Sequence, residues 1–248
     1  MDKHIKVEDF FNDRAKTYSK VSKWSVNEKL NKKSDDFLHN LHGDIAIELG
    51  AGTGVLISNL QNFKRKIALD ISKEMLSEIH NAEVEKIVGD VHNLEFPSNY
   101  FDLIICRQLL HYCNLDIAFS NITRVLKKEG LLHIVQVVDF KRVPHGWDKK
   151  WADFRNVIDR KHLRTTELEH YYNKFSLSVL KYGRLVLRDS YSWKDFFIKH
   201  NISANRETEV IDFFNSTPEY IAKAIKLEIN NKEISYNRIF KFWLLQKR

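Results

Sequence analysis

The chain has 248 residues, enough for one α/β domain with additions and a sizeable core. Hydrophobic residues make up 43% of it, yet no apolar run is long enough to cross a bilayer. The first residues lack the apolar stretch of a secretory signal. Two cysteines, Cys106 and Cys113, lie close together in the sequence, so a disulfide framework is not expected and a reducing cytoplasm fits. No cysteine or histidine spacing predicts a metal site.

The net charge of +7 raises the question of a nucleic-acid partner. The basic residues occur as short, scattered groups such as Lys64–Lys66, Lys127/Lys128 and Lys149/Lys150, interleaved with acids and apolar residues. None of them forms a long basic tract. Solvated loops and helix ends account for this pattern better than a nucleic-acid surface, so we do not expect nucleic acid to be the substrate.

Predicted helices and strands alternate through the first half of the chain. Two helical patterns occupy residues 5–41. Strands are expected at 45–49, 66–70, 85–90, 101–107 and 130–138, with helices between them at 55–60, 72–81 and 117–126. Strands alternating with helices predict right-handed crossovers and a parallel, doubly wound sheet. Ligands of such sheets bind outside the carboxyl ends of the strands.

The second half of the chain has a less regular pattern. Residues 140–164 contain a helix with Trp147, Trp151 and Phe154 on one face. Further elements are expected as helices at 166–180, 193–200 and 207–229 (with a new helix starting at Pro218), and as strands at 184–188 and 234–248.

A glycine-rich turn follows the first strand, in the stretch IAIELGAGTG at residues 45–54. Such a turn lets the backbone come close to a ligand, and the predicted helix after it would point its N-terminus at that ligand. Val55 stands where the dinucleotide fingerprint G-x-G-x-x-G needs its third glycine, and the phosphate-binding loop G-x-x-x-x-G-K-[ST] is absent. The turn therefore suits a nucleotide-like ligand without being a pyrophosphate cradle.

Acidic residues occupy the ends of the first three strands. An unpaired Glu48 carboxylate in an apolar strand would be costly, and either a ligand ammonium or nearby backbone N–H groups could offset that cost. Asp70, 20 residues after Gly50, could accept both hydroxyls of a ribose or cap the following helix. Asp90 could accept the exocyclic amine of a base or be a surface turn residue.

Four ordered motifs together resemble the class I S-adenosylmethionine-dependent methyltransferases. They are E-L-G-x-G-T-G after the first strand, D-I-S-K-E-M-L after the second, G-D-V after the third and RVLKKEGLLHI leading into the fifth. Within that class the chain is most similar to the small-molecule methyltransferases of the ubiquinone and menaquinone biosynthesis type. The resemblance implies a Rossmann-like, doubly wound seven-stranded sheet with an antiparallel last strand, and S-adenosyl-L-methionine as cofactor.

The resemblance also implies site residues, by matching positions. Glu48 and the turn Gly50, Ala51, Gly52 and Gly54 would hold the methionine moiety, and the Arg107 carbonyl would accept from its ammonium. Asp70 would bind the ribose, Ile71 and Met75 would flank the adenine, Asp90 would accept the adenine amine, and Val91 would donate its backbone N–H.

On the acceptor side, His111 is the candidate catalytic base, because it lies just past the fourth strand; alternatively it binds substrate without accepting a proton. Gln108 and Asp139 are further polar candidates. Tyr18, Trp147 and Trp151 are expected to bind substrate, although such aromatic stripes are also typical of ordinary core.

The expected organisation is one methyltransferase domain over 1–248. It comprises an N-terminal helical segment (1–41), a cofactor-binding core (42–139) and two helical substrate-lid insertions (140–165 and 193–230). Transfer of a methyl group to oxygen, nitrogen or carbon of a small molecule is the expected function. An RNA methyltransferase, for instance of tRNA, and a non-catalytic nucleotide-binding module of the same fold are the alternatives. The sequence leaves the oligomeric state open.

Overall fold

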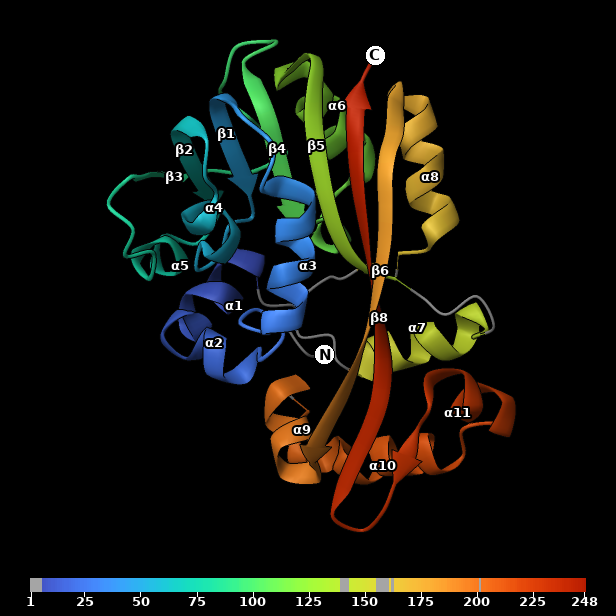
Figure 1. The fold of residues 1–248 in the computed structure, drawn as a ribbon. Coiled ribbons are helices and arrows are strands. Elements are labelled where there is room, and N and C mark those ends of the chain that lie inside the picture. Colours follow the sequence, from blue (N-terminus) through green and yellow to red (C-terminus); the bar gives the residue numbers. More distant parts are fainter. Residues whose placement is uncertain (1–5, 139–142, 155–160, 162, 201) are drawn as a thin grey trace.

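A mixed β-sheet forms the centre of the computed structural model, which describes residues 6–138, 143–154, 161, 163–200 and 202–248 (Figure 1). Its strand order is β3-β2-β1-β4-β5-β8-β6, with a short β7 beside β8. Strands β1 to β5 are parallel, and β8 runs antiparallel between β5 and β6. The expected seven-stranded Rossmann-like sheet is confirmed, with the two-residue β7 as an addition. The strands are β1 (Gly43–Leu49), β2 (Phe63–Asp70), β3 (Val84–Val88), β4 (Phe101–Arg107), β5 (Leu126–Val138), β6 (Leu177–Ser192), β7 (Glu228–Ile229) and β8 (Glu233–Lys247).

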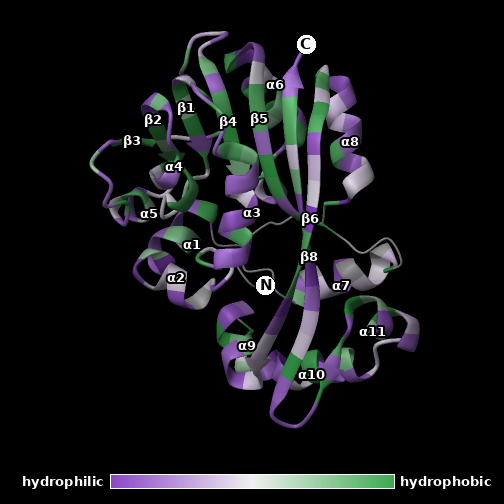
Figure 2. Ribbon diagram, viewed as in Figure 1, coloured by the Kyte–Doolittle hydropathy of each residue, from purple (hydrophilic) through white to green (hydrophobic). Residues whose placement is uncertain are grey.

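The central strands are apolar on both faces because helices cover both sides of the sheet. Ile47 and Leu49 of β1 belong to the cluster that includes Phe119 of α6 (Leu115–Val125) and Leu168 of α8 (Thr165–Lys174). Ala46, on the opposite face, belongs to the cluster built with α3 (Glu28–Leu38), α4 (Val55–Asn59) and α5 (Lys73–Ser77). The hydrophobic colouring of these strands in Figure 2 reflects this double burial.

The N-terminal segment contributes α1 (Val7–Arg14), a 3₁₀ turn (Ala15–Thr17) and α2 (Tyr18–Val21) before α3. The Ser72 hydroxyl donates to the Asn12 side-chain oxygen at 2.6 Å and so ties α1 to the start of α5. Ser72 also caps α5, because its hydroxyl oxygen accepts from the Met75 N–H at 3.1 Å. The predicted serine cap is thus present.

Strands β6 and β8 extend beyond the rest of the sheet and carry a separate helical layer (Figure 1). This layer contains α7 (His145–Phe154), α9 (Trp193–His200), α10 (Glu207–Asn215) and α11 (Glu219–Ile225). Its core is strongly aromatic, with Phe196, Phe213, Phe214, Trp151 and Tyr236 in one cluster. The layer lies at the end of the molecule that holds α1 and α2 (Figure 1).

The structure corrects two predicted elements in this half of the chain. The helix expected over 166–180 ends at Lys174, and the strand expected over 184–188 starts already at Leu177. Strand β6 pairs with β8 and lies at the end of the sheet order, so apolar side chains such as Leu180 and Tyr182 stay half exposed. Because apolar residues also occupy the exposed face of β6, its sequence lacks the alternation of apolar and polar residues by which a half-buried strand is recognised. Between residues 207 and 229 the expected break is present, because α10 ends at Asn215 and a new helix, α11, starts directly after Pro218. Only the end differs, since α11 stops at Ile225 and Glu228–Ile229 form β7.

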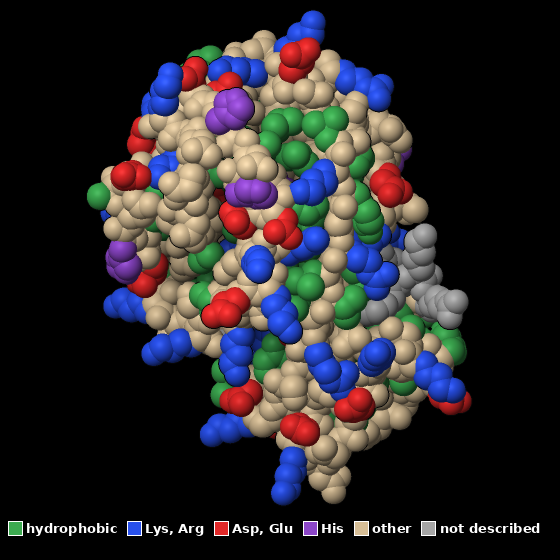
Figure 3. Space-filling model, viewed as in Figure 1, with side chains coloured by type: hydrophobic (Ala, Val, Ile, Leu, Met, Phe, Trp, Pro, Cys, Tyr) green, Lys and Arg blue, Asp and Glu red, His purple; other side chains and the backbone are tan. Residues whose placement is uncertain are grey.

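No helix in the described part of the chain is long and apolar enough to cross a membrane. On the face seen in Figure 3, lysine and arginine side chains are spread from top to bottom with acidic side chains among them. This distribution agrees with the interleaved charges of the sequence.

Phe196 tests the aromatic core of the helical layer, because its side chain is fully buried and contacts Trp151, Tyr191 and Phe214. We expect Phe196→Ala to lower the free energy of unfolding by about 3–5 kcal/mol in urea titrations. Ile198→Ala, on the same helix at a position 56% exposed, is the matched control; it should change stability by less than about 0.5 kcal/mol. Equal effects of the two variants would contradict this packing.

Candidate functional site

The loop between β1 and α4 takes a backbone path that favours glycine. Gly50, Gly52 and Gly54 all have positive φ angles, of 64°, 55° and 67°. The loop is fastened to β2 because the Ala51 N–H donates to the Leu69 carbonyl at 3.0 Å. At Gly52 an added Cβ would find the Met75 methyl as its nearest neighbour, 3.8 Å away. The loop backbone therefore forms an open wall of a cavity.

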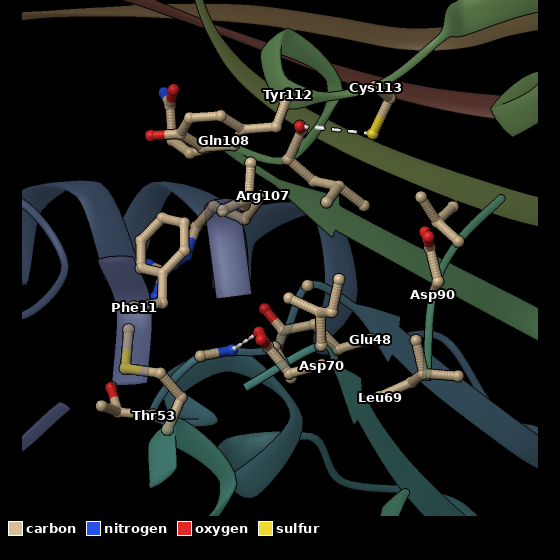
Figure 4. A pocket seen from close by; sticks show the side chains of 18 of the residues that line it. Phe11, Glu48, Thr53, Leu69, Asp70, Asp90, Arg107, Gln108, Tyr112 and Cys113 are labelled. Carbon is tan, nitrogen blue, oxygen red and sulfur yellow. Dashed lines mark hydrogen bonds between the residues drawn. The ribbon is translucent and has the colours of Figure 1, made fainter. Parts of the chain in front are cut away.

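That cavity, here called the inner pocket, encloses about 1050 Å³ of empty space, including the part open to solvent. Ten of the eleven residues expected to bind a cofactor line it: Glu48, Gly50, Ala51, Gly52, Asp70, Ile71, Met75, Asp90, Val91 and Arg107. Gly54 is the exception, since it precedes α4 and a Cβ there would come within 2.7 Å of Ile79. Figure 4 shows the Asp70 carboxylate bonded to the loop, with Arg107, Gln108 and Tyr112 across the pocket.

Glu48 places a buried carboxylate beneath the glycine loop. It is 1% exposed, and its Oε2 accepts from the Ile57 N–H at 3.0 Å. Burial raises the pKa of Glu48 to about 7, although the Arg107 charge and the Ile57 N–H favour the ionised form. Helix α4 has five residues, and its Ile57 N–H is engaged by Glu48. One N–H of the first turn of this helix is thus engaged by Glu48, and the contact expected between the helix N-terminus and a ligand stays a prediction.

Asp70 holds the glycine loop against the turn after β2. Its two oxygens accept from the Gly52 N–H at 2.7 Å and from the Ser72 N–H at 2.9 Å. Burial raises the pKa of Asp70, while these N–H groups favour the charged form. Because Ser72 is the cap of α5, the alternative role of Asp70 as that cap is not needed.

Asp90 has a defined orientation at the end of β3. Its Oδ1 accepts from the His92 N–H at 2.9 Å and lies 2.7 Å from His92 Nδ1. The other ring nitrogen, Nε2, accepts from the Asn114 N–H at 2.9 Å, so the ring proton is on Nδ1 and points at Asp90. His92 therefore links the turn around Asp90 and Val91 to the segment that starts α6.

The Arg107 side chain is a feature that our sequence analysis missed, because only the carbonyl of Arg107 was assigned a role. The guanidinium is buried, donates to the Asn31 side-chain oxygen at 2.8 Å, and lies 5.4 Å from the Trp24 ring centroid. Burial lowers the pKa of Arg107, and the Glu48 and Tyr18 side chains oppose this shift. The signal was present in the sequence: an arginine ends a strand that is otherwise nearly all apolar.

A second cavity, here called the outer cavity, adjoins the inner pocket and encloses about 870 Å³ of empty space. The N-terminal helices, the segment after β4, the end of β5, α9 and β8 all contribute to its lining. Five residues line both cavities: Phe11, Tyr18, Trp24, Gln108 and Tyr112. The two spaces therefore meet at a junction that is mostly aromatic.

Gln108 has two unusual features at this junction. It adopts a left-handed backbone conformation, with a φ of 56°, which is strained for a residue with a side chain. Its amide nitrogen is buried without a hydrogen-bond partner among the residues that the structure describes. Strain and an unsatisfied donor at one residue are typical of a site that a ligand completes.

His111 lines the outer cavity, not the inner pocket. The Gln136 amide nitrogen lies 3.0 Å from His111 Nδ1, 3.1 Å from the Gln108 side-chain oxygen and 3.2 Å from the Val137 carbonyl. The Gln136 amide nitrogen is a donor with two hydrogens for these three acceptors. Where one of them goes to His111, Nδ1 is the acceptor and neutral His111 carries its ring proton on Nε2. Gln136, a polar residue in an apolar strand, is a second residue missed from the sequence.

Trp147 and Trp151 lie apart from both cavities, although we expected them to bind substrate. Trp147 stacks on Phe213, and Trp151 packs against Phe196 and His200. Neither side chain lines the inner pocket or the outer cavity. Both rings pack inside the helical layer instead, where Trp151 contacts His200 of α9. Asp139, the third polar candidate, lies outside the described residues.

Comparisons with known proteins agree with this geometry. Residues 47–134 match the family described as a methyltransferase domain. The uncharacterised methyltransferase YcgJ of Bacillus subtilis is 26% identical over 77% of this chain and 79% of its own length. A malonyl-[acyl-carrier protein] O-methyltransferase of Herminiimonas arsenicoxydans is 25% identical over 53% of this chain and 51% of its own length.

Two solved structures share the fold. The crystal structure of YcgJ has a TM-score of 0.76 at 18% identity, and the comparison covers 90% of this chain and 99% of that one. A Haemonchus contortus phosphoethanolamine N-methyltransferase, in complex with phosphomonomethylethanolamine and S-adenosylhomocysteine, has a TM-score of 0.59 at 16% identity. That comparison covers 96% of this chain and 60% of the other. Residues 47–134 therefore match a methyltransferase domain, which supports an enzyme, and the chain shares its fold with solved methyltransferase structures.

Proposed function

We propose that this enzyme transfers the methyl group of S-adenosylmethionine to a small molecule bound in the outer cavity. The observation that carries this proposal is the shared wall of the two cavities. Phe11, Tyr18, Trp24, Gln108 and Tyr112 line both, so a donor in one and an acceptor in the other would meet there. Proximity and exclusion of water supply much of the rate of a methyl transfer.

The inner pocket fits the cofactor chemically. Glu48 is a buried carboxylate that a ligand ammonium would stabilise, and the Arg107 guanidinium on the same pocket suits a carboxylate. Asp70 and Asp90 offer acceptor oxygens for ribose hydroxyls and for the adenine amine. When bound, the cofactor would supply a methyl group on a sulfonium: an acceptor atom bonds to the methyl carbon in line with the C–S bond, that bond breaks, and S-adenosylhomocysteine leaves as a neutral thioether.

Substrate residues are proposed on the same basis. Tyr18 and Gln108 are at the junction, and the buried amide nitrogen of Gln108 is placed to donate to a bound molecule. His111 would donate from Nε2 and thereby orient the acceptor, since Nδ1 is held by Gln136. This favours the substrate-binding role of His111 over the role of a general base. Helix α9, within the expected lid insertion 193–230, would cover the acceptor.

Two alternatives are less well supported. An RNA acceptor would call for a continuous basic surface, whereas the visible charges are interspersed (Figure 3). A non-catalytic nucleotide-binding module would have no need of a second cavity that shares five residues with the first.

A methyl-label transfer screen tests the proposal. The enzyme is incubated with labelled S-adenosylmethionine and separate small-molecule, RNA and protein fractions of the source cell. We expect label in the small-molecule fraction. Label in RNA alone, lost steeply as salt is raised, would replace the proposal by the RNA alternative.

The pKa of Glu48 predicts a pH-dependent affinity for the cofactor. Because the pKa of Glu48 is about 7, its carboxyl is mostly protonated at lower pH. A ligand ammonium gains a favourable charge interaction with it only when the carboxyl is ionised. Binding of S-adenosylhomocysteine should therefore strengthen as pH rises, by about fivefold between pH 6 and pH 7 and by about twofold more up to pH 8, and level off above that. Calorimetry in two buffers of different ionisation enthalpy measures both the affinity and the released proton.

Glu48→Gln is the control for this experiment, because its amide oxygen can still accept from the Ile57 N–H. The variant should bind S-adenosylhomocysteine more weakly and show a flat pH profile over the same range. An unchanged pH profile in this variant would remove Glu48 from the ligand site.

His111 variants separate orientation from base catalysis. If Nε2–H orients the acceptor, His111→Ala should raise KM and change kcat little, and His111→Gln, which retains an N–H donor, should recover part of the KM. A fall in kcat of about 10²–10⁴-fold in both variants would instead identify His111 as the base. Affinity for S-adenosylhomocysteine should stay unchanged in both, since His111 does not line the inner pocket.

A further inference from the structure

His92 lies in a tight turn that follows β3, and three hydrogen bonds hold this turn. The turn spans Asp90 to Asn93, because the Asn93 N–H donates to the Asp90 carbonyl at 2.9 Å. The Asp90 side chain adds a second bond within the turn, since its Oδ1 accepts from the His92 N–H at 2.9 Å. The His92 carbonyl accepts from the Asn121 side-chain nitrogen of α6 at 2.8 Å. The backbone of His92 is therefore fixed by its own turn and by α6.

Both ring nitrogens of His92 are engaged with other groups of the protein. Nδ1 lies 2.7 Å from Asp90 Oδ1, and Nε2 accepts from the Asn114 N–H at 2.9 Å. A ring nitrogen that accepts carries no proton, so the ring is neutral and donates from Nδ1. His92 lines the inner pocket, but neither ring nitrogen is left to bind a ligand. A polar effect of this ring on a ligand must therefore act through Asp90.

These contacts distinguish the two carboxylate oxygens of Asp90. Oδ1 accepts from two donors of His92, the backbone N–H and the ring Nδ1–H. Within the described part of the chain no group donates to Oδ2, and the Asp90 side chain is 46% exposed. Figure 4 shows Asp90 on the side of the inner pocket that also carries Leu69 and Cys113. Oδ2 is therefore the oxygen that can accept a hydrogen bond from a ligand in this pocket.

We propose that His92 is a positioning residue, which makes the inner pocket select a base with an exocyclic amine over a base with a carbonyl at the same position. With Oδ1 held by His92, Oδ2 accepts from the amine of adenine. The carbonyl of hypoxanthine would instead bring two acceptor oxygens together, with no hydrogen between them. This inference rests on the proposed function, since it takes Asp90 as the partner of the adenine amine.

Calorimetry with two ligands tests the inference. S-adenosylhomocysteine carries the amine, and S-inosylhomocysteine carries a carbonyl in its place. We expect the unmodified enzyme to bind the first at least about tenfold more tightly than the second. His92→Ala should reduce this preference by about fivefold, because the Asp90 carboxylate can then turn away from the amine. The affinity for S-inosylhomocysteine should change little.

Conservative replacements separate positioning from a structural role. In His92→Asn the side-chain amide can donate from near the place of Nδ1, so this variant should keep most of the preference. In His92→Gln the amide reaches the place of Nε2 instead and should not restore it. His80→Ala, at an exposed histidine that does not line the inner pocket, is the matched control. If His92 only fastened the turn to α6, its variants would lower the melting temperature and leave the ratio of the two affinities unchanged.

Asp90→Asn gives a second test that leaves His92 intact. The two donors of His92 would hold the amide oxygen in the place of Oδ1, so the amide nitrogen would face the base and donate to it. This variant should therefore prefer S-inosylhomocysteine, and adding His92→Ala should abolish that reversed preference. Because Asp90→Asn alone makes a definite prediction, the test stays valid if the His92 variants fail to fold.

An equal loss of both affinities in His92→Ala would mean that the ring contacts the ligand directly, and it would overturn the inference. An Asp90→Asn variant that still prefers S-adenosylhomocysteine would overturn it as well. An unmodified enzyme that binds both ligands equally contradicts this inference alone. An enzyme that fails to bind S-adenosylhomocysteine contradicts the proposed function itself.

Discussion

The buried carboxylate of Glu48 determines how the loop, the first helix and the pocket fit together. It lies in a strand enclosed on both faces, accepts from the backbone of α4, and shares the pocket with the Arg107 guanidinium. Its folded pKa of about 7 is above the ordinary value of 4.5, so the folded chain holds this proton more tightly than the unfolded chain. The contribution of Glu48 to the free energy of unfolding is therefore greatest below pH 4.5 and declines as pH rises to about 7. Ionising Glu48 near neutral pH therefore costs folding free energy, and a cationic ligand beside the carboxylate would offset that cost.

The parallel sheet brings the remaining polar groups to the same edge. Strands β1, β2, β3 and β4 end at Leu49, Asp70, Val88 and Arg107, so side chains distant in the sequence meet around one space. Backbone N–H groups hold the Asp70 carboxylate, and His92 orients Asp90. These contacts fix the direction in which both carboxylates face.

Several parts of the molecule were predictable from the sequence for local reasons. Strand β4 matches the expected residues because it is continuously apolar, and the Ser72 cap follows from residue type and spacing. The ten residues that line the inner pocket were predicted from the resemblance that the ordered motifs carry, by matching positions. Their ligand contacts remain predictions.

The acceptor side depends on tertiary packing and was less predictable. Trp147 and Trp151 form a regular stripe, but helices that lie far away in the sequence decide what such a stripe packs against. Lys199 and Arg238 lie in separate elements and meet because β6 and β8 form a long antiparallel pair. Apolar residues on the exposed face of β6 break the apolar–polar alternation of this strand, so its full length and its pairing with β8 were not predicted from the sequence. No local pattern connects residues brought together in this way.

A crystal structure of the chain with S-adenosylhomocysteine tests the account most directly. It should show the ligand in the inner pocket, with the ribose hydroxyls on Asp70, the amino acid portion between Glu48 and Arg107, and the sulfur facing the junction at Tyr18 and Gln108. Ligand density elsewhere, or an inner pocket left empty at millimolar S-adenosylhomocysteine, would contradict the account.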